Sequence, residues 1–313
     1  MITGILALAA LTISLANPSL AASSASPSGQ QAATVAASQH RFSEAEQLLR
    51  EHLRQHPRDG ASWLQLASIA AVRADANSAT DACAQAANFV DPIVTLGCRG
   101  RVALVTQDYG PAYQALSRML QHPTYERQDD HWTGWSRGVA AELAVALQRH
   151  DEADTLFLRA LAEWPSRPLQ AAWLDHLLAT SRYSQVLASV DVNEPDDVLQ
   201  LRRLIALRRL GRSAESAALT DYYDWLYGMA LARGESGAGR EIARFYLDVR
   251  PRPERARLAA QRNLELQREA EDFALYWRAF APEPITAGEA GKNMWPQVHP
   301  PGVPPRNREN TRP

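Results

Sequence analysis

The sequence predicts an all-α protein built from repeated helical hairpins, and three observations favour this class. First, residues 42–57, FSEAEQLLREHLRQHP, are echoed by residues 150–165, HDEADTLFLRALAEWP, and each segment puts a glutamate before an alanine near the start of an amphipathic run. Second, no stretch shows the sustained alternation of apolar and polar residues that is typical of strands. Third, prolines, which cannot continue a helix, follow the amphipathic runs. They are Pro57, Pro92, Pro123 and Pro165.

The alanine of this repeated segment recurs at a regular spacing in the first half of the chain. Ala45 is followed 34 residues later by Ala79, and Ala112 comes another 33 residues on. Further candidates for the same position are Ala153, Val186, Ala214, Ala238 and Ala270, whose spacings are irregular. A repeat of this length is typical of a protein made of stacked helix-turn-helix units.

The clearest unit extends from residue 60 to about residue 94. Trp63 and Ala67 lie on its expected first helix, Ala79 and Cys83 lie on its second, and Pro92 ends it. This unit resembles the tetratricopeptide repeat, whose small residues let the two helices approach closely. The resemblance implies a right-handed α-solenoid of about seven or eight hairpins, with an extended concave surface that binds partners. We expect it to cover residues 30–281.

The two ends of the chain differ in composition from its middle. Residues 1–22 contain a short apolar run followed by small residues, which predicts a secretory signal peptide and a periplasmic protein, with a short anchor as the alternative. Residues 23–29 are expected to form a flexible linker. Residues 282–313 are rich in proline and predict a disordered tail, either a spacer or a second docking segment around residues 293–298. No other stretch is apolar enough to predict a transmembrane segment in the mature chain.

Charge and cysteine content narrow the functional classes. The formal net charge is −2, which argues against a nucleic-acid-binding protein. Cys83 and Cys98 are the two cysteines of the chain and lie 15 residues apart, on neighbouring predicted helices. In an oxidising compartment they could form a disulfide. The alternative is two separate small core residues.

The segment GESGAGRE, residues 234–241, has the spacing of a phosphate-binding loop at Gly234 and Gly239. Such a loop needs a preceding strand, a lysine and a metal-binding hydroxyl. Here a helical pattern precedes it, Arg240 replaces the lysine, and Glu241 would repel phosphates. We therefore expect a turn between helices and no nucleotide or other cofactor.

Two other groups of polar residues raise the question of chemistry. His52 and His56 share one helical face, but the glutamate of the metalloprotease signature is missing, so we expect a solvated helix end and no metal site. Residues 126–131, ERQDDH, bring carboxylates near a histidine, as general acid–base catalysis requires. Because they lie in a polar insertion, we expect an interaction loop anchored by Trp132 and Trp135, and no catalytic residues.

Arginines are interspersed with leucines and other apolar residues along residues 201–212. One interpretation is a buried helix whose arginines extend to water at its edges. The other is a basic patch for an acidic partner or for lipid headgroups.

The resemblance also implies which residues bind a partner, because first helices line the concave groove in this family. The expected groove residues are Gln65, Ser68, Trp135, Glu142, Asp175, Arg203, Tyr223 and Tyr227. The function that follows is a periplasmic, non-catalytic scaffold or adaptor that binds a peptide or protein partner. The alternatives are a cell-wall-associated enzyme or its helical superstructure, and an accessory subunit of an envelope transport or secretion complex.

Overall fold

The computed structural model describes residues 29–128 and 130–281, and within these ranges the chain is helical and contains no β-strand. The predicted all-α class is therefore confirmed. The expected signal peptide, nearly all of the expected linker and the expected tail lie outside the described residues, and Gly29 is already the first residue of a helix. The helices are α1 (Gly29–Ser38), α2 (Phe42–Gln55), α3 (Gly60–Val72), α4 (Ala76–Ala86), α5 (Pro92–Thr106), α6 (Tyr109–Leu120), α7 (Pro123–Glu126), α8 (His131–Ala146), α9 (His150–Glu163), α10 (Arg167–Ala179), α11 (Tyr183–Ser189), α12 (Asp197–Arg209), α13 (Ser213–Ala232), α14 (Gly239–Asp248), α15 (Pro253–Leu266) and α16 (Ala270–Phe280).

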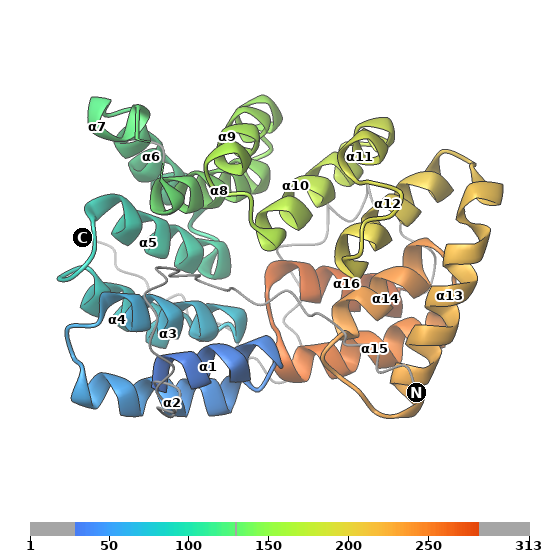
Figure 1. Ribbon diagram of the computed structural model, residues 1–313, viewed down its shortest axis with the longest axis horizontal. Helices are drawn as coiled ribbons and strands as arrows, with labels where there is room; N and C mark the ends of the chain where they lie inside the picture. The colour runs from blue at the N-terminus through green and yellow to red at the C-terminus, as the bar shows by residue number, and fades with distance from the viewer. Residues whose placement is uncertain (1–28, 129, 282–313) are drawn as a thin grey trace, which may run out of the picture.

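Neighbouring helices pack in successive pairs along the chain (Figure 1). The pairs are α1 with α2, α3 with α4, α5 with α6, α8 with α9, α10 with α11, α12 with α13, and α14 with α15. The short α7 stands between the third and fourth pairs, and α16 follows the last pair. Segment 180–195, the most strand-like part of the sequence, contains α11.

The turn inside each of the first six pairs has the same backbone geometry. A residue with a left-handed φ between 56° and 72° stands two positions before the second helix begins. These residues are His40, Ala74, Gln107, Gln148, Ser181 and Gly211. Because φ > 0 is uncommon outside glycine, its recurrence at one position marks a structural repeat. The backbone thus shows the repeat more regularly than the sequence does.

The fourth residue of the second helix in each pair is small or β-branched. It is Ala45, Ala79, Ala112, Ala153, Val186, Ser216 and Ala256 in the seven pairs. All of these except Ala112, which is partly exposed, are at most 1% exposed. A small side chain here lets the two helices of a pair approach closely.

Three of the positions that we expected for this residue are wrong. Ser216 takes the place expected for Ala214, because α13 begins at Ser213. Ala238 caps the N-terminus of α14, a first helix, and Ala270 begins α16. The 20-residue length of α13 displaces everything after it relative to a 34-residue period, so the true equivalent in the last pair is Ala256.

The chain closes on itself, because the loop between α15 and α16 contacts the N-terminal helices. The backbone N–H of Arg268 donates to the carbonyl oxygen of Val72 at the end of α3, over 2.7 Å. The Gln267 side chain lies 3.0 Å from Nδ1 of His40, between α1 and α2. In Figure 1 the last helices accordingly lie between the N-terminal pairs and α12 and α13. Helices from both ends of the chain therefore surround the centre of the molecule.

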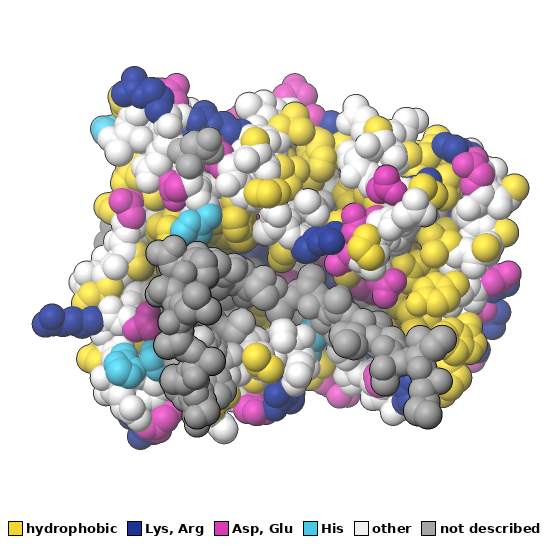
Figure 2. All heavy atoms as spheres, in the orientation of Figure 1, with side chains coloured by type: hydrophobic (Ala, Val, Ile, Leu, Met, Phe, Trp, Pro, Cys, Tyr) yellow, Lys and Arg dark blue, Asp and Glu magenta, His cyan; other side chains and the backbone are white. Residues whose placement is uncertain are grey.

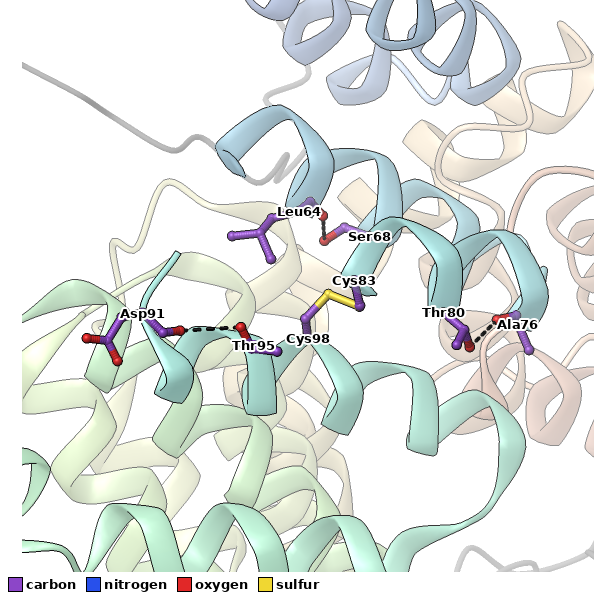
Figure 3. Close-up of a disulfide and its surroundings, with 8 residues drawn as sticks. All are labelled: Leu64, Ser68, Ala76, Thr80, Cys83, Asp91, Thr95 and Cys98. Atoms are coloured by element: carbon purple, nitrogen blue, oxygen red, sulfur yellow. Dashed lines mark hydrogen bonds between the residues drawn. A yellow bond between two sulfur atoms is a disulfide. The ribbon is translucent and has the colours of Figure 1, made fainter. Parts of the chain in front are cut away.

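A disulfide joins two successive pairs. Cys83 on α4 and Cys98 on α5 point toward one another and are bonded, with their Cα atoms 5.8 Å apart (Figure 3). Both residues are buried, at 1% and 3% exposure. The bond therefore lies in the core of the interface between the second and third pairs.

Residues 234–238 form the turn between α13 and α14, as we expected from the sequence, and residues 239–241 begin α14. Gly234 has a left-handed φ of 75° just after α13 ends. Gly239 is the first residue of α14, where it faces α15 at close range. A Cβ atom added to Gly239 would lie 2.9 Å from Cβ of Asn263 and 3.0 Å from the carbonyl oxygen of Ala259. Helix packing, with no phosphate needed, explains this glycine.

Replacing Gly239 with alanine should lower the free energy of unfolding by about 1–3 kcal/mol, because the new methyl group would push α14 away from the backbone of α15. Thermal unfolding followed by circular dichroism measures this loss. Gly110→Ala is the matched control, because nothing lies within 4 Å of a Cβ at Gly110 in α6. Equal effects of the two substitutions would contradict the packing explanation.

Candidate binding cavity

A partly open cavity of about 490 Å³ lies at the centre of the molecule, lined by helices from both halves of the described chain. The first helix of each of the seven pairs contributes to its wall, and α16 and the loop before it close it. Among the lining residues are Thr34 of α1, Gln65 of α3, Arg101 of α5, Trp135 of α8, Asp175 of α10, Arg202 of α12, Arg240 of α14 and Glu271 of α16. Of the second helices, α2 contributes Phe42 and α13 contributes Tyr227.

Six of the eight expected groove residues line this cavity. They are Gln65, Ser68, Trp135, Glu142, Asp175 and Tyr227. Their hydrogen bonds differ: the Gln65 amide donates to Oγ1 of Thr34 over 3.0 Å, and the Ser68 hydroxyl donates to the carbonyl oxygen of Leu64. The sequence therefore predicted a common surface for residues of four helices, α3, α8, α10 and α13, that the structure also brings together.

The other two residues, Arg203 and Tyr223, do not line the cavity. On α12 the expected register is wrong by one residue, because Arg202, 2% exposed, faces inward in place of Arg203. Tyr223 is 1% exposed and lies in the core, where its hydroxyl donates to Oδ1 of Asp197 over 3.0 Å. Burial and the Asp197 carboxylate raise the pKa of Tyr223 well above its ordinary value.

The outer face of α13 carries the remaining aromatic residues of this segment. Tyr222, Trp225 and Met229 are 47%, 63% and 42% exposed. Figure 2 shows apolar side chains gathered along α13 at this edge of the molecule. Helical periodicity separates this face from the face that carries Tyr223 and Tyr227.

Asp175 holds three helices together at one side of the cavity. Its carboxylate accepts two hydrogen bonds from Arg202 of α12, each 2.9 Å long, and also binds Arg244 of α14. Both guanidinium groups are almost completely buried. They hold the pKa of Asp175 at about 2, although burial alone would raise it. Arg202 also donates to Glu241 over 2.7 Å. This hydrogen bond connects the end of segment 234–241 to α12.

A second group of ion pairs connects α5, α8, α14 and the loop before α16. Arg101 donates to Glu142 over 3.0 Å and to Glu269 over 2.8 Å. Arg240 donates to Glu269 and to Asp272, each over 2.7 Å. Two arginines thus flank Glu269 and, despite its burial, lower its pKa to about 2. These ion pairs hold the α15–α16 loop against α5 and α14, in addition to the backbone hydrogen bond between Arg268 and Val72.

The sequence did not point to several residues of this wall. Arg101, Glu269 and Glu271 belong to no recognisable motif, and nothing local distinguishes them from surface residues. Arg240 and Glu241 lie in the segment that resembled a phosphate loop, and Arg202 lies in the arginine-rich segment. Both segments stood out in the sequence because of their composition, which did not indicate the contacts that they make in the cavity wall.

The other polar groups raised by the sequence have structural partners. Nε2 of His52 lies 2.9 Å from Oδ2 of Asp59, the residue that caps α3. Asp130 caps α8 by accepting hydrogen bonds from the backbone N–H groups of Trp132 and Thr133. Asp129 lies outside the described residues. In the described ranges no group of three or more His, Cys, Asp or Glu side chains is arranged to hold a metal ion.

In the arginine-rich segment, residues 201–212, three of the five arginines form ion pairs within the chain. Besides the inward-facing Arg202, Arg209 donates to Asp248 over 2.9 Å and Arg212 donates to Glu215 over 2.5 Å. These pairs favour the interpretation of a packed helix with arginines at its edges.

In the described residues, fold and cavity together define an all-helical protein of paired helices around a central, partly open cavity, whose largely apolar wall carries several charged side chains. Comparison with models of known protein families and with curated proteins found no match. None of the helices in residues 29–128 and 130–281 is both long and apolar enough to cross a membrane.

Proposed function

We propose that this chain is an exported, non-catalytic binding protein that takes a short extended segment of an envelope partner protein into its central cavity. In this proposal the helix pairs form a right-handed solenoid of the tetratricopeptide-repeat type, closed by the α15–α16 loop. The protein acts in the periplasm as a scaffold or adaptor.

One observation carries the proposal: the first helices of all seven pairs line the cavity. This is the arrangement that the resemblance to tetratricopeptide repeats implies for a binding surface. The recurring left-handed turn supports the same relationship between the pairs.

The size of the cavity indicates what kind of partner fits. About 490 Å³ falls within the range of ligand pockets, which is about 300–1,000 Å³. A folded domain is far too large for this cavity, whereas a few residues of extended chain fit into it. Preformed walls held by ion pairs would order such a segment without being reorganised themselves.

Site-specific photo-crosslinking in the living envelope tests the proposal. A photoreactive aromatic residue replaces Trp135, which lines the cavity, or Leu158 of α9, which is 58% exposed outside it. We expect one protein to be captured from position 135 and not from position 158. Mass spectrometry should map the crosslink to a short segment, and a synthetic peptide of that segment should prevent the capture.

Equal capture from both positions would contradict binding in the cavity. No capture from position 135, together with retention of the purified protein on isolated cell wall, would favour the wall-associated alternative.

A further inference from the structure

The charges around the cavity do not balance. A single network of ion pairs connects four arginines with six carboxylates, so the negative charges exceed the positive ones by two. The arginines are Arg101, Arg202, Arg240 and Arg244, and the carboxylates are Glu142, Asp175, Glu241, Glu269, Glu271 and Asp272. In a cavity with largely apolar walls an excess of one sign attracts a ligand of the other sign. Figure 2 shows several acidic side chains in the region of α10 and α12.

Glu142 is the carboxylate with the weakest compensation in this network. It accepts one hydrogen bond, from Arg101, and Arg101 is shared with Glu269. Its pKa is raised, because burial disfavours the charged form, Arg101 offsets this only in part, and Glu269 repels it. About a third of the side chain, 32%, stays exposed at the cavity. A cation placed beside Glu142 would complete its pairing.

Tyr227 supplies an independent indication of a ligand. The residue is 3% exposed and lines the cavity, and its hydroxyl has no hydrogen-bond partner among the described residues. The hydroxyl oxygen is not one of the fully buried side-chain atoms that lack a partner, so it stays open to the cavity, where a ligand can bind it. A tyrosine hydroxyl can also accept a hydrogen bond from an ammonium group.

The spacing along α8 fits a cation carried on an apolar stem. Trp135, Val139 and Glu142 all line the cavity, at positions i, i+4 and i+7 of one helix. Seven residues of helix span about 10 Å, so the indole ring and the carboxylate lie at two ends of one continuous strip. Trp164 also lines the cavity. Aromatic faces attract cations and pack well against methylene groups.

We propose that the cavity binds an alkylammonium group, the side chain of a lysine in the partner's segment, with its charge at Glu142 and its stem along Trp135. This inference rests on the proposed function and names the chemistry that the same cavity recognises. Lys292 is the chain's own sole lysine and lies outside the described residues, so the test uses a Lys292→Met background. The chain's own side-chain ammonium group then cannot compete.

Binding of small probes to the full chain tests the inference. The probes are Nα-acetyl-lysine N-methylamide, its uncharged counterpart Nα-acetyl-norleucine N-methylamide, and the diamine cadaverine, which has no peptide groups. The indole N–H signal of Trp135, identified with Trp135→Phe, reports binding in NMR titrations. The variants are Glu142→Gln and, as a matched control on the exposed side of α13, Glu215→Gln.

We expect the lysine probe to bind the Glu215→Gln variant as tightly as it binds the Lys292→Met parent. It should bind the Glu142→Gln variant at least tenfold more weakly. The norleucine probe should bind the Lys292→Met parent at least tenfold more weakly than the lysine probe does. Glu142→Gln should unfold at or above the temperature of the parent chain, because it removes a poorly compensated buried charge, so weaker binding would not reflect unfolding.

Three results would overturn the inference: equal binding of the norleucine probe, unchanged binding by Glu142→Gln, or no shift of the Trp135 signal with the lysine probe. Cadaverine binding as tightly as the lysine probe would overturn the peptide source of the ammonium group. If crosslinking from position 135 still captures a partner segment in any of these cases, the proposed function survives and only the ligand chemistry is wrong.

Discussion

Replacing Asp175 with asparagine should lower the free energy of unfolding by about 3 kcal/mol, because the change leaves buried Arg202 and Arg244 without the carboxylate that joins them. This value is at the low end for a broken buried pair, since Glu241 and Glu271 still compensate the two arginines. Asp175 also keeps a quarter of its side chain exposed at the cavity. Urea unfolding at neutral pH measures the loss.

Asp221→Asn is the matched control. Asp221 binds Arg250 over 3.0 Å, but its side chain is 72% exposed. Exposed pairs contribute about 0–1 kcal/mol, so the control should unfold almost like the parent chain. If Asp175→Asn lost no more stability than this control, the three-helix junction would not depend on the carboxylate.

The pH dependence of stability should change in the same variant. The pKa of Asp175 lies at about 2 in the folded chain and at 3.8 ordinarily, which corresponds to a stabilisation on the order of 2 kcal/mol. A lowered pKa stabilises the fold above pH 3.8, and this contribution disappears as the pH falls through about 2. Between pH 4 and pH 2 the variant should therefore lose less stability than the parent chain.

Removing the disulfide should have an effect of similar size. The Cys83→Ala/Cys98→Ala double variant should unfold with a free energy lower by about 3 kcal/mol, because the bond closes a 15-residue segment and restricts the unfolded chain. Urea unfolding under oxidising conditions measures the difference. The bond also joins α4 to α5, so the loss should appear in one cooperative transition if the pairs unfold together.

A reducing agent provides the control for the disulfide. It should destabilise the parent chain about as much as the double substitution, and it should leave the double variant unchanged because the chain has two cysteines only. Free thiols detected in the folded, unreduced protein would contradict the bond, as would a double variant with unchanged stability.

Local patterns in the sequence were sufficient to predict the helices and six residues of the cavity wall. Proline, acidic caps and amphipathic periodicity act over a few residues, so they predict where helices begin and which face is buried. The unit around residues 60–94 has a clear register, and Gln65 and Ser68 accordingly line the cavity. The register was wrong by one residue on α12, at Arg203, and by two at Ala214, whereas Ala238 was misplaced because the long α13 before it breaks the 34-residue period.

The left-handed turns show why the repeat was hard to follow along the chain. Five of the six recurring positions are occupied by residues other than glycine, namely His40, Ala74, Gln107, Gln148 and Ser181. The surrounding helices impose this φ, so no local composition marks it. A period that exists in the backbone can thus be weak in the sequence.

The sequence by itself determined the helical class, most of the small residues between paired helices and the inward faces of α3, α8 and α10, because these depend on contacts within three or four residues or within one hairpin. Only the tertiary structure decided that the chain closes through Val72, His40 and the α15–α16 loop, and that Arg101, Glu142 and Glu269 meet. Glu269 lies 168 residues from Arg101 along the chain. Their contact depends on the summed rotations of all the intervening pairs, which no local pattern encodes.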